Sequence, residues 1–219
     1  RRVLFRSKHE GYYLLTVGFL GTVLNQFLKL LCRIPRPWVL DPDFTIVESA
    51  RAEATGYSFP SGHTQNAVGT FGGIARATKR HCLRWVCVVI FVLVSFSRMY
   101  LGVHTPLDVG VSFVIAAVLV FAIYPLMRRA DRYPRLMAGL LASMVLLSAA
   151  YLTFTLVYPF PPDIDSANLA SGVENGWKLL GATLGIALAW WLDRQYVRFE
   201  TKAIWWVQAI KFIVGRSEE

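Results

Sequence analysis

The stretch TPLDVGVSFVIAAVLVFAIYPLM, Thr105–Met127, is an almost unbroken run of apolar side chains. An α-helix rises about 1.5 Å per residue, so a run of this length can cross the ~30 Å hydrocarbon core of a bilayer. The composition agrees, because 55% of the residues are hydrophobic and only 17% are charged, against roughly 25% in an ordinary soluble domain. The chain is therefore predicted to be a membrane protein.

Five further apolar segments accompany this run. They are Tyr12–Leu31, Ser61–Thr78, Trp85–Met99, Leu136–Tyr158 and Trp177–Leu192. The second of these carries polar residues and the third is short, and we expect their polar side chains to face the interior of a helix bundle. The sequence thus predicts an all-α, polytopic membrane bundle of about six transmembrane helices. We expect one domain over residues 1–219, truncated at its N-terminus because the sequence begins without methionine.

The chain has 23 basic and 14 acidic residues, a net charge of +9, and 17 of the basic residues are concentrated in four clusters. These clusters lie before the first predicted span and after the second, fourth and sixth, within residues 1–8, 76–84, 128–135 and 194–216. Helices that alternate in direction place all four clusters on one face, which the positive-inside rule identifies as cytoplasmic. The charge therefore indicates membrane orientation, and a nucleic-acid partner is not expected.

Three polar segments converge at the opposite face. They are KLLCRIPRP (29–37), PSGH (60–63) and SRMYLGVHTPLD (97–108). Taken singly, their basic residues suit an interfacial anchor or a contact with lipid phosphates. Taken together, the cations Lys29, Arg36 and Arg98 meet a requirement of phosphoryl transfer, because they can balance the charge on the equatorial oxygens. No metal or other cofactor is then expected.

The PSGH segment is predicted to open a helix. The turn at Ser61 and Gly62 would present unpaired backbone N–H groups and a hydroxyl, and a glycine lets the backbone approach an anion closely. His63, on the same segment, is suited to donate a proton to a leaving oxygen. If a helix begins at HTPLD, His104 and Asp108 share one face, and the carboxylate orients the imidazole as a nucleophile.

The three segments resemble the signature motifs of the type 2 phosphatidic acid phosphatase superfamily, K-x6-R-P, P-S-G-H and S-R-x5-H-x3-D. Every fixed position of those motifs is present between Lys29 and Asp108. The resemblance implies a PAP2-like fold and assigns phosphate binding to Lys29, Arg36, Ser61, Gly62 and Arg98. It also implies that His104 is the nucleophile of a phosphohistidine mechanism, His63 the acid and Asp108 the orienting carboxylate.

The resemblance implies a metal-independent phosphatase that cleaves a lipid phosphate or diphosphate, with membrane lipids as neighbours. The charge clusters predict that its active site lies at the extracytoplasmic face of a cell membrane. Undecaprenyl diphosphate is the favoured substrate, and the alternatives are phosphatidylglycerol phosphate, phosphatidic acid and a sphingoid base phosphate. Arg33 and Arg51 would suit the extra charge of a diphosphate, or are solvated or bound to lipid head groups. The absence of any Asn-x-Ser/Thr site favours a bacterial membrane.

Two other classes of protein are considered. The same motifs occur in vanadium haloperoxidases, but those enzymes are soluble and the apolar spans disfavour them. A non-catalytic membrane scaffold is disfavoured because no motif residue is missing. The C-terminal segment 201–219 lies either along the cytoplasmic interface or against the bundle.

Overall fold

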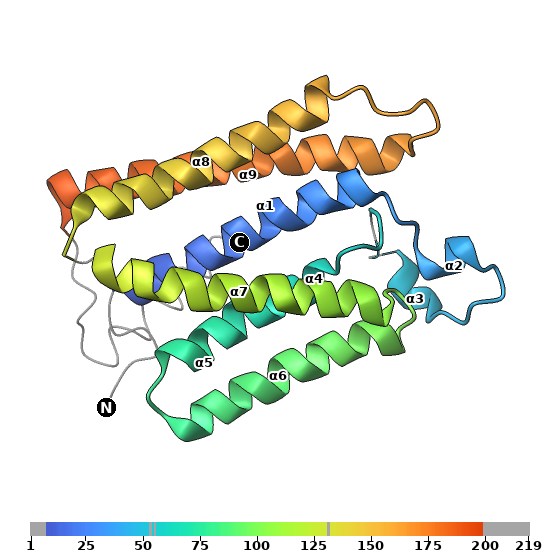
Figure 1. Ribbon diagram of the computed structural model, residues 1–219, viewed down its shortest axis with the longest axis horizontal. Coiled ribbons are helices and arrows are strands. Elements are labelled where there is room, and N and C mark those ends of the chain that lie inside the picture. The colour runs from blue at the N-terminus through green and yellow to red at the C-terminus, as the bar shows by residue number, and fades with distance from the viewer. Residues whose placement is uncertain (1–7, 53, 55, 131, 199–219) are drawn as a thin grey trace.

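The computed structural model describes residues 8–52, 54, 56–130 and 132–198 of the 219-residue chain, and these residues form helices and loops with no strand among them (Figure 1). The long helices are α1 (Lys8–Cys32), α6 (His81–Tyr100), α7 (Pro106–Ala130), α8 (Pro134–Val157) and α9 (Ser166–Leu192). The shorter ones are α2 (Pro37–Leu40), α3 (Glu48–Arg51), α4 (Gly62–Ala67), α5 (Gly73–Ala77) and the π-helical turns η1 (Val68–Gly72) and η2 (Asp193–Val197).

Each of the six predicted spans coincides with helix, which confirms the all-α membrane bundle. Within the described part of the chain, four segments are both long and apolar enough to cross a membrane. They are Lys8–Leu40, His81–Tyr100, Pro106–Ala130 and Pro134–Val157. The count of six is therefore approximate.

The two remaining spans fall short for different reasons. The helix formed by α4, η1 and α5 has 16 residues, about 24 Å at 1.5 Å per residue, which is shorter than the bilayer core. Helix α9 is long enough, but its first half carries polar and charged side chains such as Asn175 and Lys178.

Helix α9 begins at Ser166, about three turns before the predicted start at Trp177. The sequence of these turns has no apolar run, so hydropathy gave no signal for them. A cap marks the start instead, because the side chain of Asp165 accepts hydrogen bonds from the backbone N–H groups of Ala167 and Asn168 at 2.9 and 3.0 Å.

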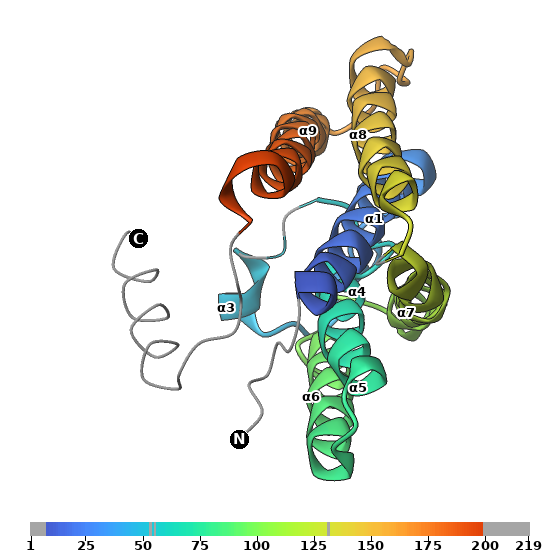
Figure 2. The same ribbon diagram turned by 90° about the vertical axis from the view of Figure 1, so that its left-hand side faces the viewer.

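Helix α1 lies at the centre of the bundle and packs against α4, α7, α8 and α9 (Figure 2). Its buried side chains, among them Tyr13 and Val17, meet Val120 of α7 and Met144 of α8 in one apolar core. The hydroxyl of Tyr13 donates to the backbone oxygen of Val120 at 2.9 Å, so the polar end of this buried ring is satisfied. The interior is therefore packed as a protein core and is not open to lipid.

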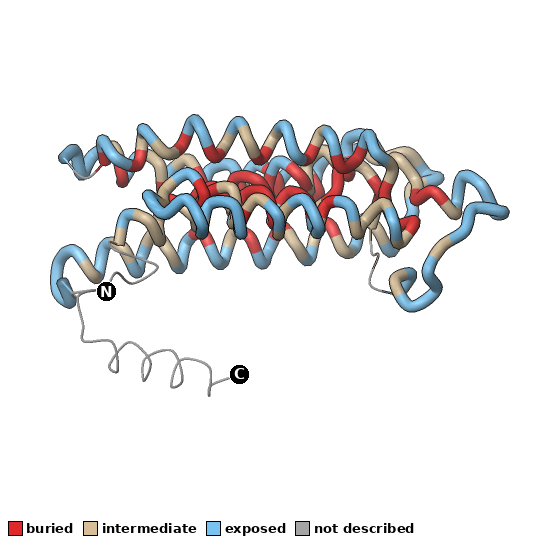
Figure 3. The backbone as a smooth tube through the Cα atoms, turned by 90° about the horizontal axis from the view of Figure 1, so that it is seen from below, coloured by how far each residue is buried: buried red, intermediate tan, exposed pale blue. Residues whose placement is uncertain are grey.

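The outer surface of the bundle is apolar. Buried residues follow the axis of the bundle, whereas the outward helix faces are exposed (Figure 3). Large hydrophobic side chains such as Leu93, Phe96, Phe121 and Leu146 are more than half exposed. A surface of this kind is expected to contact lipid, since soluble monomers rarely expose so much contiguous apolar area.

One end of the bundle gathers the segments that carry the three motifs. The C-terminal ends of α1 and α6 and the N-terminal ends of α4 and α7 lie there, beside α2 and α3 (Figure 1). The side-chain amide of Asn25 in α1 donates to the backbone oxygen of Pro60 at 3.3 Å, which ties the loop before α4 to α1. The predicted alternatives for residues 201–219 lie outside the described residues.

Candidate active site

A cavity of about 470 Å³ opens at this end of the bundle, between α1, α4 and the connection from α6 to α7. We call it the polar cavity. Six of the eight residues predicted for the site line it: Lys29, Arg36, Gly62, His63, Arg98 and His104. The other two, Ser61 and Asp108, lie behind its wall and are 0% and 1% exposed.

The two cations from the first motif are held by backbone oxygens. Lys29, in the last turn of α1, is buried and its ammonium group donates to the carbonyl of Tyr57. Arg36 donates from Nε to the oxygen of Gly56 at 3.0 Å and from Nη1 to the oxygen of Val103 at 2.8 Å. These carbonyls belong to two different loops, so the position of the guanidinium group depends on both.

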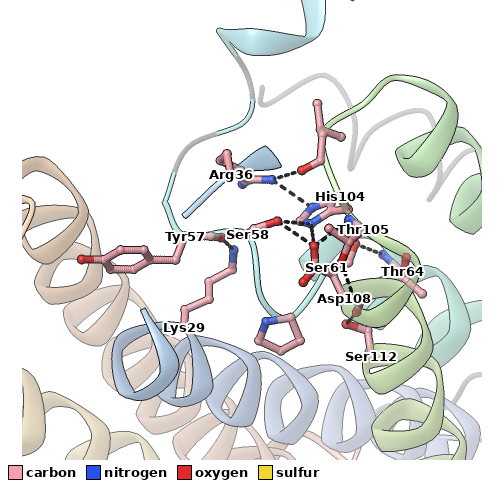
Figure 4. Close-up of polar contacts among 12 residues, drawn as sticks. Lys29, Arg36, Tyr57, Ser58, Ser61, Thr64, His104, Thr105, Asp108 and Ser112 are labelled. Atoms are coloured by element: carbon pink, nitrogen blue, oxygen red, sulfur yellow. Dashed lines mark hydrogen bonds and ion pairs between the residues drawn. The ribbon is translucent and has the colours of Figure 1, made fainter. Parts of the chain in front are cut away.

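His104 lies between Arg36 and Asp108 (Figure 4). Its Nε2 atom is 3.1 Å from Nη1 of Arg36, and its Nδ1 atom is 3.5 Å from Oδ2 of Asp108. Only 5% of the residue is exposed. With Nδ1 facing the carboxylate, the Nε2 lone pair faces Arg36 and accepts a hydrogen bond from its Nη1 atom.

Helix α7 begins at Pro106, one residue after the start of the predicted span at Thr105, so His104 is not in the helix. The physical reason is a reciprocal cap: Oγ1 of Thr105 accepts the N–H of Asp108 at 3.3 Å, and Oδ2 of Asp108 accepts the N–H of Thr105 at 2.8 Å. His104 therefore sits in the turn before α7. The predicted contact with Asp108 is still made, because this cap fixes the carboxylate beside the ring.

A residue absent from the prediction completes this arrangement. The hydroxyl of Ser58 donates to Oδ2 of Asp108 at 2.7 Å and lies 3.5 Å from Nδ1 of His104 (Figure 4). Ser58 is fully buried, and its N–H donates to the oxygen of Ile34 at 2.9 Å. One serine in a loop carries no periodic or spacing signal, so the sequence alone did not reveal it.

Ser61 is buried and does not line the cavity. Its hydroxyl oxygen accepts the N–H of Thr64 at 3.4 Å and so caps α4, while its own N–H donates to the oxygen of Asp108 at 3.2 Å. The N–H of Ser61 thus ties the start of α4 to α7, and its hydroxyl oxygen caps α4 itself. Gly62 and His63, the next two residues, are the ones that line the cavity.

Arg98 reaches the cavity from the last turn of α6, where its Nε donates to Oγ of Ser97 at 3.3 Å. His63 reaches it from the first turn of α4 and is exposed. The cavity thus presents basic groups from three elements and two imidazoles from different segments. Within the described ranges, no group of three His, Cys, Asp or Glu side chains lies together in a way that could hold a metal ion.

Burial lowers the pKa of His104 to about 4, with the nearby charges of Arg36 and Lys29 acting in the same direction and Asp108 opposing them. Because the shift is downward, the ring stays neutral through the range near pH 6.5 in which a solvated histidine titrates. We expect nitrogen NMR of the free protein in micelles to show neutral His104 down to a pH of about 4. The signal is assigned by its loss in His104→Asn, and a midpoint near 6.5 would contradict the expected burial.

The part of the chain that carries these residues is similar to a known protein family. The family model of the PAP2 superfamily matches residues 10–132. Undecaprenyl-diphosphatase BcrC of Bacillus subtilis (strain 168) is 35% identical over 119 residues, which cover 54% of this chain and 58% of the relative. Phosphatidylglycerophosphatase B of the same strain is 31% identical over 130 residues, covering 54% and 59%.

A third relative is an undecaprenyl-diphosphatase of Sulfolobus acidocaldarius, 31% identical over 106 residues, or 48% of each chain. The matches therefore span about half the length of these curated relatives. No solved structure matches the chain.

Proposed function

Because this chain belongs to the PAP2 superfamily, we propose that it is a membrane lipid phosphatase whose reaction takes place in the polar cavity. One observation carries the proposal. Lys29, Arg36 and Arg98 line the same cavity as the two histidines, although these residues come from separate segments of the chain. Such a set provides charge for a phosphoryl group, a nucleophile and an acid in one place.

In the proposed reaction, Nε2 of His104 attacks the phosphorus atom. An N–P bond forms, the P–O bond to the lipid breaks, and its electron pair leaves with the lipid oxygen. Asp108 holds the ring through Nδ1 and stabilises the positive charge that develops on it. The Nη1 atom of Arg36 lies 3.1 Å from Nε2, so it can turn from the ring to an oxygen of the arriving phosphoryl group.

His63 is proposed to donate a proton to the leaving lipid oxygen and then to take one from the water that cleaves the phosphohistidine. Lys29, Arg36 and Arg98 stabilise the charge on the equatorial oxygens, and Gly62 lets the backbone come close to the anion. The cations take the role that a metal ion has in many phosphoryl transfers, so the reaction is proposed to be metal-independent.

Ser58 is proposed to act through Asp108. Its hydrogen bond of 2.7 Å occupies the carboxylate oxygen that faces His104, and so fixes the direction of that oxygen. Ser58→Ala is expected to lower kcat about ten-fold, the scale of one hydrogen bond to a charged group, with KM little changed. Steady-state kinetics in micelles would check this, with Ser58→Thr expected to restore part of the rate. A rise in KM alone would contradict the role.

The proposed substrate is a lipid diphosphate, with undecaprenyl diphosphate favoured, and the names of two relatives support it. Phosphatidylglycerol phosphate is the second candidate, because a third relative is named for that activity. Phosphate release from purified protein is the test, using both lipids, phosphatidic acid and a sphingoid base phosphate in matched micelles with and without a chelator. A ten-fold preference for a monoester would refute the diphosphate, and dependence on Mg²⁺ would refute the metal-free mechanism.

The polar cavity is proposed to face outward from the cytoplasm. The basic connection at residues 78–80 lies at the opposite end of the bundle from the cavity, as the positive-inside rule requires for that orientation (Figure 1). A lipid whose tail stays in the membrane can then present its head group at the ends of α1 and α4.

This topology can be tested with cysteines placed in a variant whose native Cys32, Cys82 and Cys87 are replaced by serine. Ser166→Cys, exposed at the start of α9, is expected to react with an impermeant thiol reagent on intact cells. Lys79→Cys, between α5 and α6, is expected to react only after lysis. The reverse pattern would place the cavity in the cytoplasm.

A further inference from the structure

Two neutral amide side chains line the polar cavity beside its catalytic groups. Gln26 precedes Lys29 by three residues in α1, and Asn66 follows His63 by three residues in α4. Residues three apart in a helix share a face. Gln26 therefore lies about one helical turn, roughly 5 Å, closer to the middle of the bundle than Lys29, and Asn66 lies closer than His63 by the same distance.

The carboxamide oxygens of both residues face a neighbouring helix. Nδ2 of Asn175 in α9 donates to Oε1 of Gln26 at 3.4 Å. Oδ1 of Asn66 lies 3.5 Å from Oγ1 of Thr22 in α1, whose hydroxyl donates to the backbone oxygen of Gly18 at 2.8 Å. An amide has one acceptor end and one donor end. Because each oxygen faces a neighbouring helix, the NH₂ groups are the parts of the two amides that can donate hydrogen bonds to a ligand in the cavity.

We propose that Gln26 and Asn66 form a subsite that donates hydrogen bonds to the non-transferred phosphate of a lipid diphosphate. This inference rests on the proposed function. The subsite lies beyond the leaving oxygen, on the side of the cavity toward the bilayer centre. In a diphosphate the group at that place is a phosphate, whereas in an alkyl monophosphate it is a methylene carbon that accepts no hydrogen bond.

The chemistry of the two ends of the cavity differs in a way that suits this substrate. The terminal phosphoryl group gains charge at the reacting centre and meets cations there. The remaining phosphate stays on the product, which must leave after each turnover. Neutral donors recognise its oxygens without the strong attraction of a further ammonium or guanidinium group.

The arginines that the sequence offered for a diphosphate are placed elsewhere. Arg51 is exposed, pairs with Glu48 at 3.0 Å, and does not line the polar cavity. Arg33 lines a neighbouring cavity with Asp163, Asp165 and Glu174. The amides are therefore better placed than either arginine to contact the second phosphate.

The test compares kcat/KM for a polyprenyl diphosphate and for the monophosphate of the same chain length. Gln26→Met keeps the length of the side chain and removes the amide, and Asn66→Leu does the same for the shorter residue. Each variant is expected to lose about ten-fold on the diphosphate, the scale of one hydrogen bond to a charged group, and to change little on the monophosphate. Gln195→Leu, an exposed amide in η2 at the other end of the bundle, is the matched control.

The monophosphate reaction also reports whether each variant is folded. An equal loss on both substrates would overturn the subsite, because it indicates a structural role, and so would an unchanged rate on the diphosphate. If the unaltered protein releases phosphate from neither lipid nor from the other lipid phosphates, the proposed function itself has failed, which is a different result from loss of selectivity in the variants.

Discussion

Replacing His104 with alanine is expected to abolish phosphate release, by a factor on the order of a million if it behaves like other catalytic nucleophiles. The physical reason is that Nε2 of this ring is the atom proposed to bond to phosphorus, and Asp108 cannot act without the ring it orients. The same variant should form no acid-labile phosphoenzyme when it is mixed with a radiolabelled lipid phosphate.

His81→Ala is the matched control for this change. His81 is exposed at the first position of α6, at the opposite end of the bundle from the polar cavity, so its loss should leave the rate unchanged. Retention of a phosphoenzyme by His104→Ala would show that another residue is the nucleophile. An equal loss in His81→Ala would show that the assay follows folding and not chemistry.

Replacing His63 with alanine is expected to slow the reaction with a lipid substrate by about 10² to 10⁴, the range of general acid catalysis. An aryl phosphate has a leaving group that needs no proton, so it should still phosphorylate His104. Hydrolysis of the phosphohistidine then lacks its base. The covalent intermediate is therefore expected to accumulate in His63→Ala with the aryl substrate.

Rapid-quench measurement of the phosphoenzyme would check this expectation. The informative comparison is between leaving groups of different basicity in the same variant. A loss of rate that is the same for an alkyl and an aryl phosphate would argue against proton donation by His63. The unchanged protein provides the reference burst for each substrate.

The helices were predictable because hydropathy reports directly on the lipid that surrounds them. Tyr12–Leu31 and Thr105–Met127 differ from α1 and α7 only at their ends. The early start of α9 was not predictable in this way, because its first turns are polar and depend on a cap at Asp165. The π-helical turn η1 also had no signal, since a wider turn leaves no distinct residue pattern.

Part of the candidate site was predictable from the sequence, and part of it was not. The alternating direction of the predicted helices was enough to predict that the segments with Lys29, His63 and His104 meet at one face, and the described structure brings these residues to one cavity. Ser58 and the carbonyl of Tyr57 were missed because their roles depend on how one loop folds against α1 and α7. The chemical roles of all these residues, and the single domain over 1–219, remain predictions.

The hydrogen bonds from α1 to the loop before α4 bear on how the protein is made. During synthesis α1 reaches the membrane before Tyr57 and Pro60 have emerged, so Lys29 and Asn25 then lack these two carbonyl acceptors. A lysine deep in an isolated helix opposes insertion by about 3 kcal/mol, although one near the end can extend toward the head groups. Helix α1 can therefore insert with the Lys29 ammonium group directed to the head groups, and this group becomes buried only when the loop packs against α1.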